Sequence, residues 1–208
     1  MGVRDRTVGA FLDSVAAATP TPGGGSVAAL AGALSVALSR MVAGLARDKK
    51  GYEGVQVDLG SLEDRAAGVQ ARLEALVEED ARAYEEVLAA MRLPRATARE
   101  KAARVDAMQA AYRGATEVPL RTVAECIEAL EIAAGAAEKG NRGATTDAGV
   151  AILLADAGAR AAGLNCRVNL ASIRDEAFRD RTEARLADLN RRADVAAQRG
   201  MALVESRI

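Results

Sequence analysis

Asp80 stands in a helical pattern at a position where that pattern requires an apolar residue. The stripe of the segment 62–91 is formed by Leu62, Ala66, Val69, Leu73 and Leu76, and then by Tyr84, Val87 and Met91. The spacing of four on each side predicts that Asp80 points inward. A buried carboxylate has a raised pKa and suits general acid–base catalysis. Alternatively, the helix is slightly rotated, so that Ala81 faces the core and Asp80 pairs with a neighbouring arginine.

A second candidate is the turn "TPTPGGGS" at residues 19–26, which precedes a long alanine-rich helix. Ser26 is predicted to be the N-cap of that helix. The bare amides of Gly23, Gly24 and Gly25 then lie at a helix N-terminus, where they suit an anion or a polarised carbonyl. No Gly-Lys-Ser/Thr follows, so this is not a Walker loop. The alternative is a tight helix–helix corner in which side chains would clash.

A third set of polar residues lies in "KGNRGATTD" and "LNCRVNLASIRDE", and comprises Asn141, Asp147, Asn165, Asn169 and Asp175. Capping and turn formation suffice to explain Asn141 and Asp147. Asparagine is a poor residue for a helix interior, and Asn165 and Asn169 are one turn apart. This pair therefore indicates a fixed hydrogen-bonding task.

The composition limits which chemistry these residues can take part in. The chain contains no histidine, which excludes Ser-His and Cys-His nucleophile systems and the commonest zinc ligand. Cys126 and Cys166 lack metal-ligand spacing and are predicted to be buried free thiols in a reducing compartment. No metal site is predicted. The groups that remain available for catalysis or binding are carboxylates, lysine and arginine side chains, hydroxyls, amides and backbone dipoles.

Charge and hydropathy argue against nucleic-acid and membrane partners. Lys+Arg number 28 against Asp+Glu 29, and aromatic residues make up 2% of the chain, so neither a basic field nor stacking platforms are present. The stretch 27–46 has membrane-spanning length, but it contains Arg40 and much alanine, so we interpret it as the buried helix of a soluble bundle. The charged N-terminal segment does not resemble a secretory signal, and we expect a cytoplasmic protein.

Helical periodicity extends over nearly the whole chain. Helices are predicted over residues 4–18, 26–46, 58–91, 97–115, 119–138, 146–162 and 175 to the end. Thr97 and Glu100 fit a capping box, Pro119 suits a first helical turn, and Thr146 or Asp147 suits an N-cap. The predicted fold is an all-α, single-domain (1–208), up-and-down bundle of six to eight helices.

Two apolar faces support this interpretation. The first predicted helix places Val8, Phe11, Leu12 and Val15 on one side. The second carries the small residues Ala28, Gly32, Ser35 and Ser39 on one side. Small residues allow backbones to approach closely, and such a face also suits a seam between subunits. The sequence therefore predicts a homodimer.

Four stretches, taken in order, resemble the cyclodeaminase/cyclohydrolase family of folate enzymes. They are "PTPGGGSVAALAGALSVALSRMV", "EEDARAYEEVLAAMRLP", "ATEVPLRTVAEC" and "KGNRGATTDAGVAILLADAGARAAGLNCRVNLASIRDEAF". The family comprises formiminotetrahydrofolate cyclodeaminases, fused to a formiminotransferase in animals, and stand-alone methenyltetrahydrofolate cyclohydrolases of bacteria. The resemblance covers about residues 5–180. Cys166 departs from it, since an aliphatic residue is expected between the two asparagines.

The resemblance implies an all-helical homodimer and a site for a tetrahydrofolate derivative. The proposed catalytic carboxylate of the family motif Asp-Ala-x-Ala-aromatic falls on Asp80. The hydrogen-bonding edge of the pterin pairs with carboxylates and amides, and the glutamate tail binds cations or helix N-termini. The implied substrate-binding residues are Gly23, Gly24, Gly25, Ser26, Asn141, Asp147, Asn165, Asn169, Asp175, Lys49 and Lys50. Arg47, Lys139 and Arg142 are further cations for the tail, which is either a single glutamate or a polyglutamate.

The implied reaction is deamination of 5-formimino-tetrahydrofolate to 5,10-methenyl-tetrahydrofolate plus ammonia, with Asp80 moving the proton from N10 to the leaving nitrogen. One alternative is hydrolysis of 5,10-methenyl- to 10-formyl-tetrahydrofolate, with Asp80 as the base. Another is a non-catalytic helical dimer that binds folate or another protein. Neither reaction requires a metal or a cofactor beyond the folate substrate. The sequence does not separate the two reactions.

Overall fold

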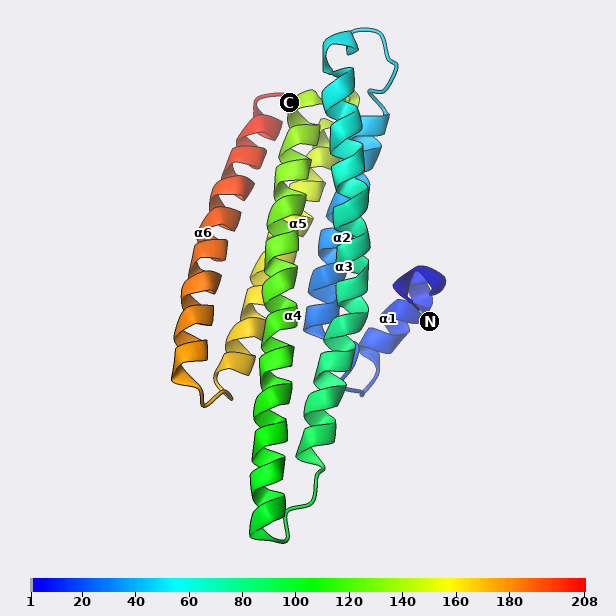
Figure 1. Cartoon of the computed structure of the whole chain (residues 1–208). Coiled ribbons are helices and arrows are strands. Elements are labelled where there is room, and N and C mark those ends of the chain that lie inside the picture. The colour runs from blue at the N-terminus through cyan, green and yellow to red at the C-terminus, as the bar shows by residue number, and fades with distance from the viewer. Residues whose placement is uncertain (1) are drawn as a thin grey trace.

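The computed structural model describes residues 2–208, which form six α-helices and three short 3-10 helices. The α-helices are α1 (Val8–Ala16), α2 (Gly24–Gly44), α3 (Gln56–Met91), α4 (Ala98–Lys139), α5 (Thr145–Leu170) and α6 (Glu176–Glu205). The 3-10 helices are η1 (Val3–Asp5), η2 (Glu53–Val55) and η3 (Arg142–Ala144). Helices α2 to α6 run side by side along the long axis, and α1 lies at the flank (Figure 1). Residues 2–208 contain no strand, so the predicted all-α bundle is confirmed.

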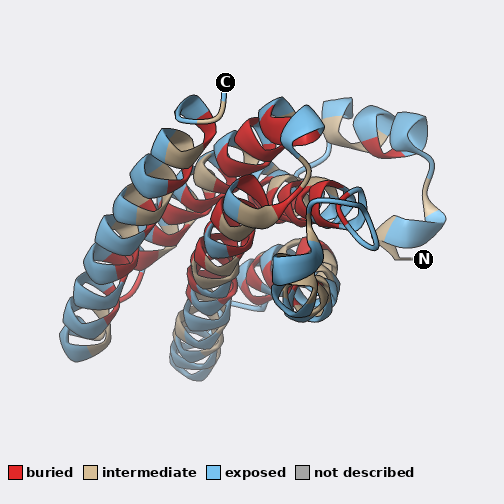
Figure 2. Cartoon of the chain, turned by 90° about the horizontal axis from the view of Figure 1, so that it is seen from above, coloured by how far each residue is buried: buried red, intermediate tan, exposed pale blue. Residues whose placement is uncertain are grey.

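Helix α2 is central, and it packs against α3, α4 and α5. Its face of small residues is buried as predicted, with Ser35 and Ser39 fully buried. A Cβ on Gly158 of α5 would lie 2.8 Å from the carbonyl oxygen of Ala28, so these two helices touch backbone to backbone. The face therefore serves packing within one chain. Figure 2 shows buried residues concentrated on the sides where the helices face one another.

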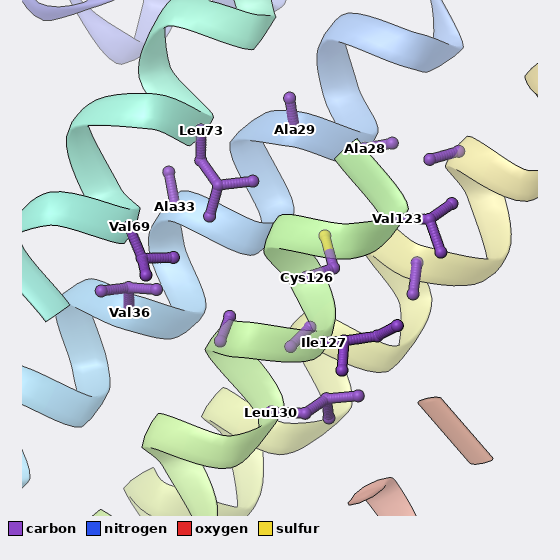
Figure 3. Packing of buried hydrophobic residues seen from close by; sticks show 14 of the residues in the cluster. Ala28, Ala29, Ala33, Val36, Val69, Leu73, Val123, Cys126, Ile127 and Leu130 are labelled. Carbon is purple, nitrogen blue, oxygen red and sulfur yellow. The ribbon is translucent and has the colours of Figure 1, made fainter. Parts of the chain in front are cut away.

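The two cysteines are free and buried, as predicted. Cys126 of α4 lies among α2, α3 and α5 in the apolar core (Figure 3), and a Cβ on Gly32 would lie 2.9 Å from its sulfur. Burial raises the pKa of Cys126 to about 12 and that of Cys166 to about 11. Both side chains therefore act as small apolar residues in the core.

Pro119 lies inside α4, so the two helices predicted over 97–115 and 119–138 are one helix of 42 residues. A proline at this position cannot donate to the carbonyl of Ala115, four residues earlier. The side-chain amide of Asn169, on α5, donates to that carbonyl instead at 2.6 Å. This replacement explains how the helix continues through a buried proline, and why an asparagine is tolerated within α5.

Several predicted helix ends are wrong. Helix α2 begins two residues before Ser26 and has Gly23 as its N-cap. Helix α5 begins at Thr145 after Ala144, so neither Thr146 nor Asp147 is its N-cap, and it continues to Leu170. The Thr97–Glu100 capping box is confirmed.

Two predicted apolar faces are buried only in part. In α1 only Phe11 is buried, whereas Val8 is 79% and Leu12 61% exposed. In α3 the first part of the stripe, from Ala66 to Leu76, is buried, and Leu62 before it is half-buried. Tyr84 is 42% and Met91 39% exposed. Ala83, Val87 and Ala90 are buried instead, so beyond Asp80 the buried face of α3 passes through Ala83 and Ala90 and not through Tyr84 and Met91. The α3–α4 hairpin continues beyond the ends of α2 and α5 (Figure 1).

Within residues 2–208, α2 is the one helix whose length and apolar composition would allow it to cross a membrane. Half of its most apolar window is buried inside the bundle, and the core helix of a soluble protein passes the same test.

Candidate active site

The carboxylate of Asp80, on α3, lies against the first turn of α2. It accepts a hydrogen bond from the Ser26 hydroxyl, with 3.0 Å between Oγ and Oδ2, and also from the Ser26 backbone amide. The N-cap residue Gly23 has no side chain that can accept from this turn. Asp80 therefore does from a neighbouring helix what an N-cap side chain does locally. Ser26, predicted as the N-cap, instead joins the two helices.

Gly25 makes this contact possible. A Cβ at this position would lie 2.0 Å from Oδ1 and 2.5 Å from Cγ of Asp80, which no side chain tolerates. The glycine turn is thus a tight corner in which a side chain would clash, as one of the two interpretations predicted. The group that packs against the bare backbone is the Asp80 carboxylate. Asp80 faces α2 and forms no ion pair with an arginine within residues 2–208, so the rotated-helix alternative does not apply.

Burial raises the pKa of Asp80 above its ordinary value, and the hydroxyl and backbone amide of Ser26 act in the opposite direction. The net shift is upward. A carboxyl group with a raised pKa takes up and releases a proton more readily near neutral pH than an exposed aspartate does. The side chain is half-buried, so solvent and a small reactant still reach it.

Asn165 of α5 lies beside the same turn. A Cβ on Gly24 would be 3.7 Å from its Nδ2 and 4.0 Å from its Oδ1. Its Nδ2 donates to the carbonyl of Ala161 at 2.9 Å within its own helix. The amide group is therefore held in place beside Gly24, in the glycine turn against which Asp80 also lies.

Tyr84 is a further candidate site residue, which the sequence pattern had placed in the core stripe of α3. It lies one helical turn beyond Asp80 on α3 and is 42% exposed. A half-exposed aromatic ring next to a carboxylate offers a flat apolar wall for a ring of a substrate. The spacing of Asp80 and Tyr84 within "DARAY" was the available signal.

Four of the predicted binding residues lie at the opposite end of α2. Lys49 and Lys50 are exposed in the loop after this helix, and Asn141 and Asp147 flank η3 beside that loop. Helix α2 has 21 residues and is thus about 30 Å long at ~1.5 Å per residue. Within one chain these residues do not meet Asp80, so the single predicted cluster is divided in two.

Three of the predicted polar residues are engaged in holding the backbone. Asn141 donates to the carbonyl of Leu45 at 2.7 Å and accepts from the amide of Gly143 at 2.9 Å. Asp175 is the N-cap of α6 and also pairs with Arg113 at 2.8 Å. Asn169 binds the Ala115 carbonyl, as described above. Of the residues predicted to bind the substrate, the structure gathers Gly23 to Ser26 and Asn165 at one end of α2, where Asp80 contacts Gly25 and Ser26.

No group of three or more Cys, Asp or Glu side chains placed to hold a metal ion occurs in the described part of the chain. The candidate site consists of a carboxylate, a hydroxyl, an amide, an aromatic ring and the amides of a helix N-terminus.

The structure is an all-helical bundle that holds the carboxylate of Asp80 against the glycine-rich N-terminus of α2. The chain belongs to the formiminotransferase-cyclodeaminase family, whose model matches residues 7–188. The sequence resemblance is therefore confirmed, as is the prediction that the chain is an enzyme of the folate cyclodeaminase/cyclohydrolase type.

Its relatives carry two different names. It is 42% identical over 185 residues to methenyltetrahydrofolate cyclohydrolase of Methylorubrum extorquens, covering 89% of this chain and 88% of that protein. It is 32% identical over 206 residues to formimidoyltransferase-cyclodeaminase of Rattus norvegicus, covering 98% of this chain and 38% of the rat protein. The crystal structure of formiminotetrahydrofolate cyclodeaminase from Thermotoga maritima superposes with a TM-score of 0.89 at 28% identity, covering 98% of each chain.

Proposed function

We propose that this chain is a methenyltetrahydrofolate cyclohydrolase that converts 5,10-methenyl- to 10-formyl-tetrahydrofolate. The observation that carries the proposal is the half-buried Asp80 carboxylate, held by Ser26 against Gly25 in a protein of this family. The choice between the two reactions is supported by the Methylorubrum cyclohydrolase, because this chain is 42% identical to it over nearly the whole of both chains, against 28% identity to the Thermotoga cyclodeaminase. The sequence had favoured deamination and had kept hydrolysis as its alternative.

In this reaction water attacks the methenyl carbon, which is bonded to N5 and N10. Ionised Asp80 takes a proton from the attacking water as the carbon becomes tetrahedral. Asp80 then gives this proton to N5 as the bond between carbon and N5 breaks. The remaining hydroxyl proton is released to solvent as the formyl C=O bond forms on N10. These proton transfers balance with one carboxylate, so the reaction requires neither a metal nor a redox cofactor.

Deamination of 5-formimino-tetrahydrofolate is the second candidate, supported by the close structural match to the Thermotoga cyclodeaminase. N10 attacks the carbon of the protonated formimino group, which gives a tetrahedral centre bearing NH2, and Asp80 carries the N10 proton to this nitrogen, which leaves as ammonia. Both reactions pass through a tetrahedral centre at the same carbon. A single carboxylate beside that carbon therefore serves either reaction.

The surroundings of Asp80 suit the two rings of the substrate. The side-chain amide of Asn165 matches the hydrogen-bonding edge of a pterin, and the Tyr84 ring offers a surface for stacking. The bare glycine turn lets the substrate approach the backbone of α2 closely. We assign pterin binding to this end of the bundle.

We further propose that the enzyme is a homodimer in the cytoplasm, formed through an exposed apolar face of α2 and α5. On α2, Val27, Leu34 and Met41 recur every seven residues and are 40%, 49% and 41% exposed. On α5, Leu153 and Leu164 are 58% and 57% exposed. Monomeric proteins rarely expose so many large apolar side chains along one line.

A twofold axis through the middle of this face would place the two α2 helices antiparallel. The Lys49 and Lys50 loop of one copy would then lie beside the Asp80 end of the other copy. Two exposed ammonium groups suit the carboxylates of a glutamate tail, mono- or polyglutamylated. This arrangement gives both lysines the role that the sequence assigned to them.

The proposed function is tested by adding the purified protein to 5,10-methenyl-tetrahydrofolate and following the loss of its near-ultraviolet absorbance against a buffer blank. Rapid loss with 10-formyl-tetrahydrofolate as the product supports the cyclohydrolase. If the loss is not accelerated, the formimino substrate is tested next, and ammonia release there supports the cyclodeaminase. Failure with both substrates overturns the enzymatic proposal and leaves a folate- or protein-binding helical dimer.

A further inference from the structure

The Ser26 hydroxyl lies between two oxygen atoms that can both accept its hydrogen. Its Oγ is 2.9 Å from the carbonyl oxygen of Val77 and 3.0 Å from Oδ2 of Asp80. Ser26 is fully buried, so water does not stand in for a missing partner. We propose that Ser26 is a positioning residue for Asp80, and that its hydroxyl reorients between the two oxygens as Asp80 loses and gains its proton. The proposal rests on the proposed function, in which Asp80 carries that proton.

A count of hydrogens supports this arrangement. A serine hydroxyl has one hydrogen to donate and two lone pairs that accept. When Asp80 is ionised, both neighbours are acceptors, and the hydrogen serves the carboxylate because a charged acceptor makes the stronger bond. When Asp80 is protonated on Oδ2, its own hydrogen points to Ser26 Oγ, and the serine hydrogen turns to the carbonyl of Val77. Each state then has a complete hydrogen-bond chain.

The Val77 carbonyl is a suitable second acceptor because it belongs to the helical ladder of α3. A helical carbonyl oxygen keeps one lone pair beyond the backbone hydrogen bond that it accepts, so it tolerates the absence of the serine hydrogen. Reorientation therefore leaves no buried donor unpaired in either protonation state. Without the hydroxyl, the carboxyl group of Asp80 loses a donor when it is ionised and an acceptor for its hydrogen when it is protonated, which costs free energy.

The other groups that the structure describes around Asp80 do not donate a hydrogen bond to its carboxylate in place of Ser26. The first turn of α2 carries no acidic side chain. Glu79, next to Asp80 on α3, is paired with Arg121 of α4. From α5, the Asn165 amide donates to its own helix. Burial and the two groups of Ser26 are what set the pKa of Asp80.

The test compares Ser26→Ala with Ser35→Ala, a control on the same helix. Ser35 is equally buried, and its hydroxyl has no hydrogen-bond partner among the described residues. Ser26→Ala is expected to lower kcat ~10- to 100-fold, the effect of losing one hydrogen bond to a charged group, with KM nearly unchanged. The acidic limb of the kcat–pH profile moves to higher pH, because the ionised carboxylate loses a donor. Ser35→Ala should leave both unchanged, and Ser26→Thr should restore most of kcat.

A measurement on the wild-type protein keeps the proposal falsifiable if the Ser26 variants do not fold. The carbonyl carbon of Val77 and the carboxyl carbon of Asp80 are followed by NMR during a pH titration, with Asp80→Asn used to assign the latter. The proposal requires the Val77 signal to shift with the midpoint of Asp80. A Val77 signal that does not follow Asp80, or a Ser26→Ala enzyme with unchanged kcat and pH profile, overturns it. If the wild type turns over neither folate, the proposed function fails, while the Val77 titration still decides the role of Ser26.

Discussion

A glycine-containing turn lies at each end of α2, and the two turns use their hydrogen-bonding groups differently. At the Asp80 end, three glycines precede Ser26, and the acceptor for the first turn comes from α3. At the Lys49 end, the Gly- and Asn-containing turn around Asn141 packs on the loop that follows α2. Both turns break helices, and both were predicted to bind the substrate.

The difference lies in where the hydrogen-bonding capacity of each turn is used. At the Lys49 end, Asn141 is bonded through both ends of its amide to the backbone, and the Arg142 amide donates to the Tyr52 hydroxyl at 3.0 Å. At the Asp80 end no local side chain satisfies the first turn, so a titratable group from another helix does. Asn141 is occupied by hydrogen bonds to the backbone, whereas Asp80 is held beside the turn with its carboxylate partly open to solvent.

The largest effect is expected for Asp80→Asn. Loss of the carboxylate that lies against the glycine turn should lower kcat by a factor of about 10² to 10⁴, the range typical for a general acid–base group. The absorbance assay with 5,10-methenyl-tetrahydrofolate measures this, and circular dichroism checks that the helices persist. Turnover that stays within a few-fold of wild type would remove Asp80 from the mechanism.

The same substitution should stabilise the fold at neutral pH. The pKa of Asp80 is raised in the folded state by burial, so the folded protein binds this proton more tightly than the unfolded chain does. The contribution of Asp80 to stability is therefore most favourable below its unfolded pKa and is lost as pH rises through the folded pKa. Thermal melts should show a higher Tm for Asp80→Asn at pH 7 than for wild type, and a smaller difference in acid.

Gly25→Ala should come next, because the new Cβ would lie 2.0 Å from Oδ1 of Asp80. The carboxylate must leave its place, and we expect kcat to fall by about 10², since even small misplacement of a reacting group costs this much. The control is Gly9→Ala in α1, where a Cβ meets nothing within 4 Å. An unchanged kcat in Gly25→Ala would show that the close approach is dispensable.

Replacing both lysines at the other end, Lys49→Ala with Lys50→Ala, should act on binding. We expect KM to rise several-fold for a polyglutamylated folate and less for the monoglutamate, with kcat unchanged, since each lost contact between exposed charges is worth roughly 0.5 kcal/mol. Raising the salt concentration should weaken the wild type in the same direction. Equal KM values for variant and wild type with the polyglutamate would argue against the proposed dimer arrangement.

The smallest effect on activity is expected for Asn141→Ala, which should act on stability. It removes two hydrogen bonds to the backbone at the Lys49 end, and we expect a loss of about 1–2 kcal/mol in urea unfolding. Asn165→Ala is the matched variant at the Asp80 end, where the amide bonds only within its own helix. It should weaken substrate binding and change stability less. If Asn141→Ala weakened substrate binding and Asn165→Ala mainly lowered stability, the proposed difference between the two ends would be wrong.

Much of this architecture was predictable from local pattern. The stripe of Leu120, Val123, Ile127 and Leu130 is buried as its periodicity required, and the Thr97–Glu100 capping box is present. These features depend on residues within a few positions of one another, so helix periodicity and capping chemistry determine them. The inward position of Asp80 followed from the same periodicity.

Other features depended on contacts that no local pattern contains. Whether Pro119 ends a helix depended on Asn169, 50 positions later, which binds the carbonyl that the proline leaves free. Whether Ser26 caps its own helix depended on Asp80, which occupies the space beside Gly25.

The sequence by itself determined the helices, their apolar stripes and a set of residues able to do acid–base chemistry. Only the tertiary structure decided which members of that set meet, because α2 separates Lys49 from Asp80 by its full length of about 30 Å. Propensity and periodicity act over a few residues. The site is made by packing between α2, α3 and α5, whose contacting residues are distant in the chain.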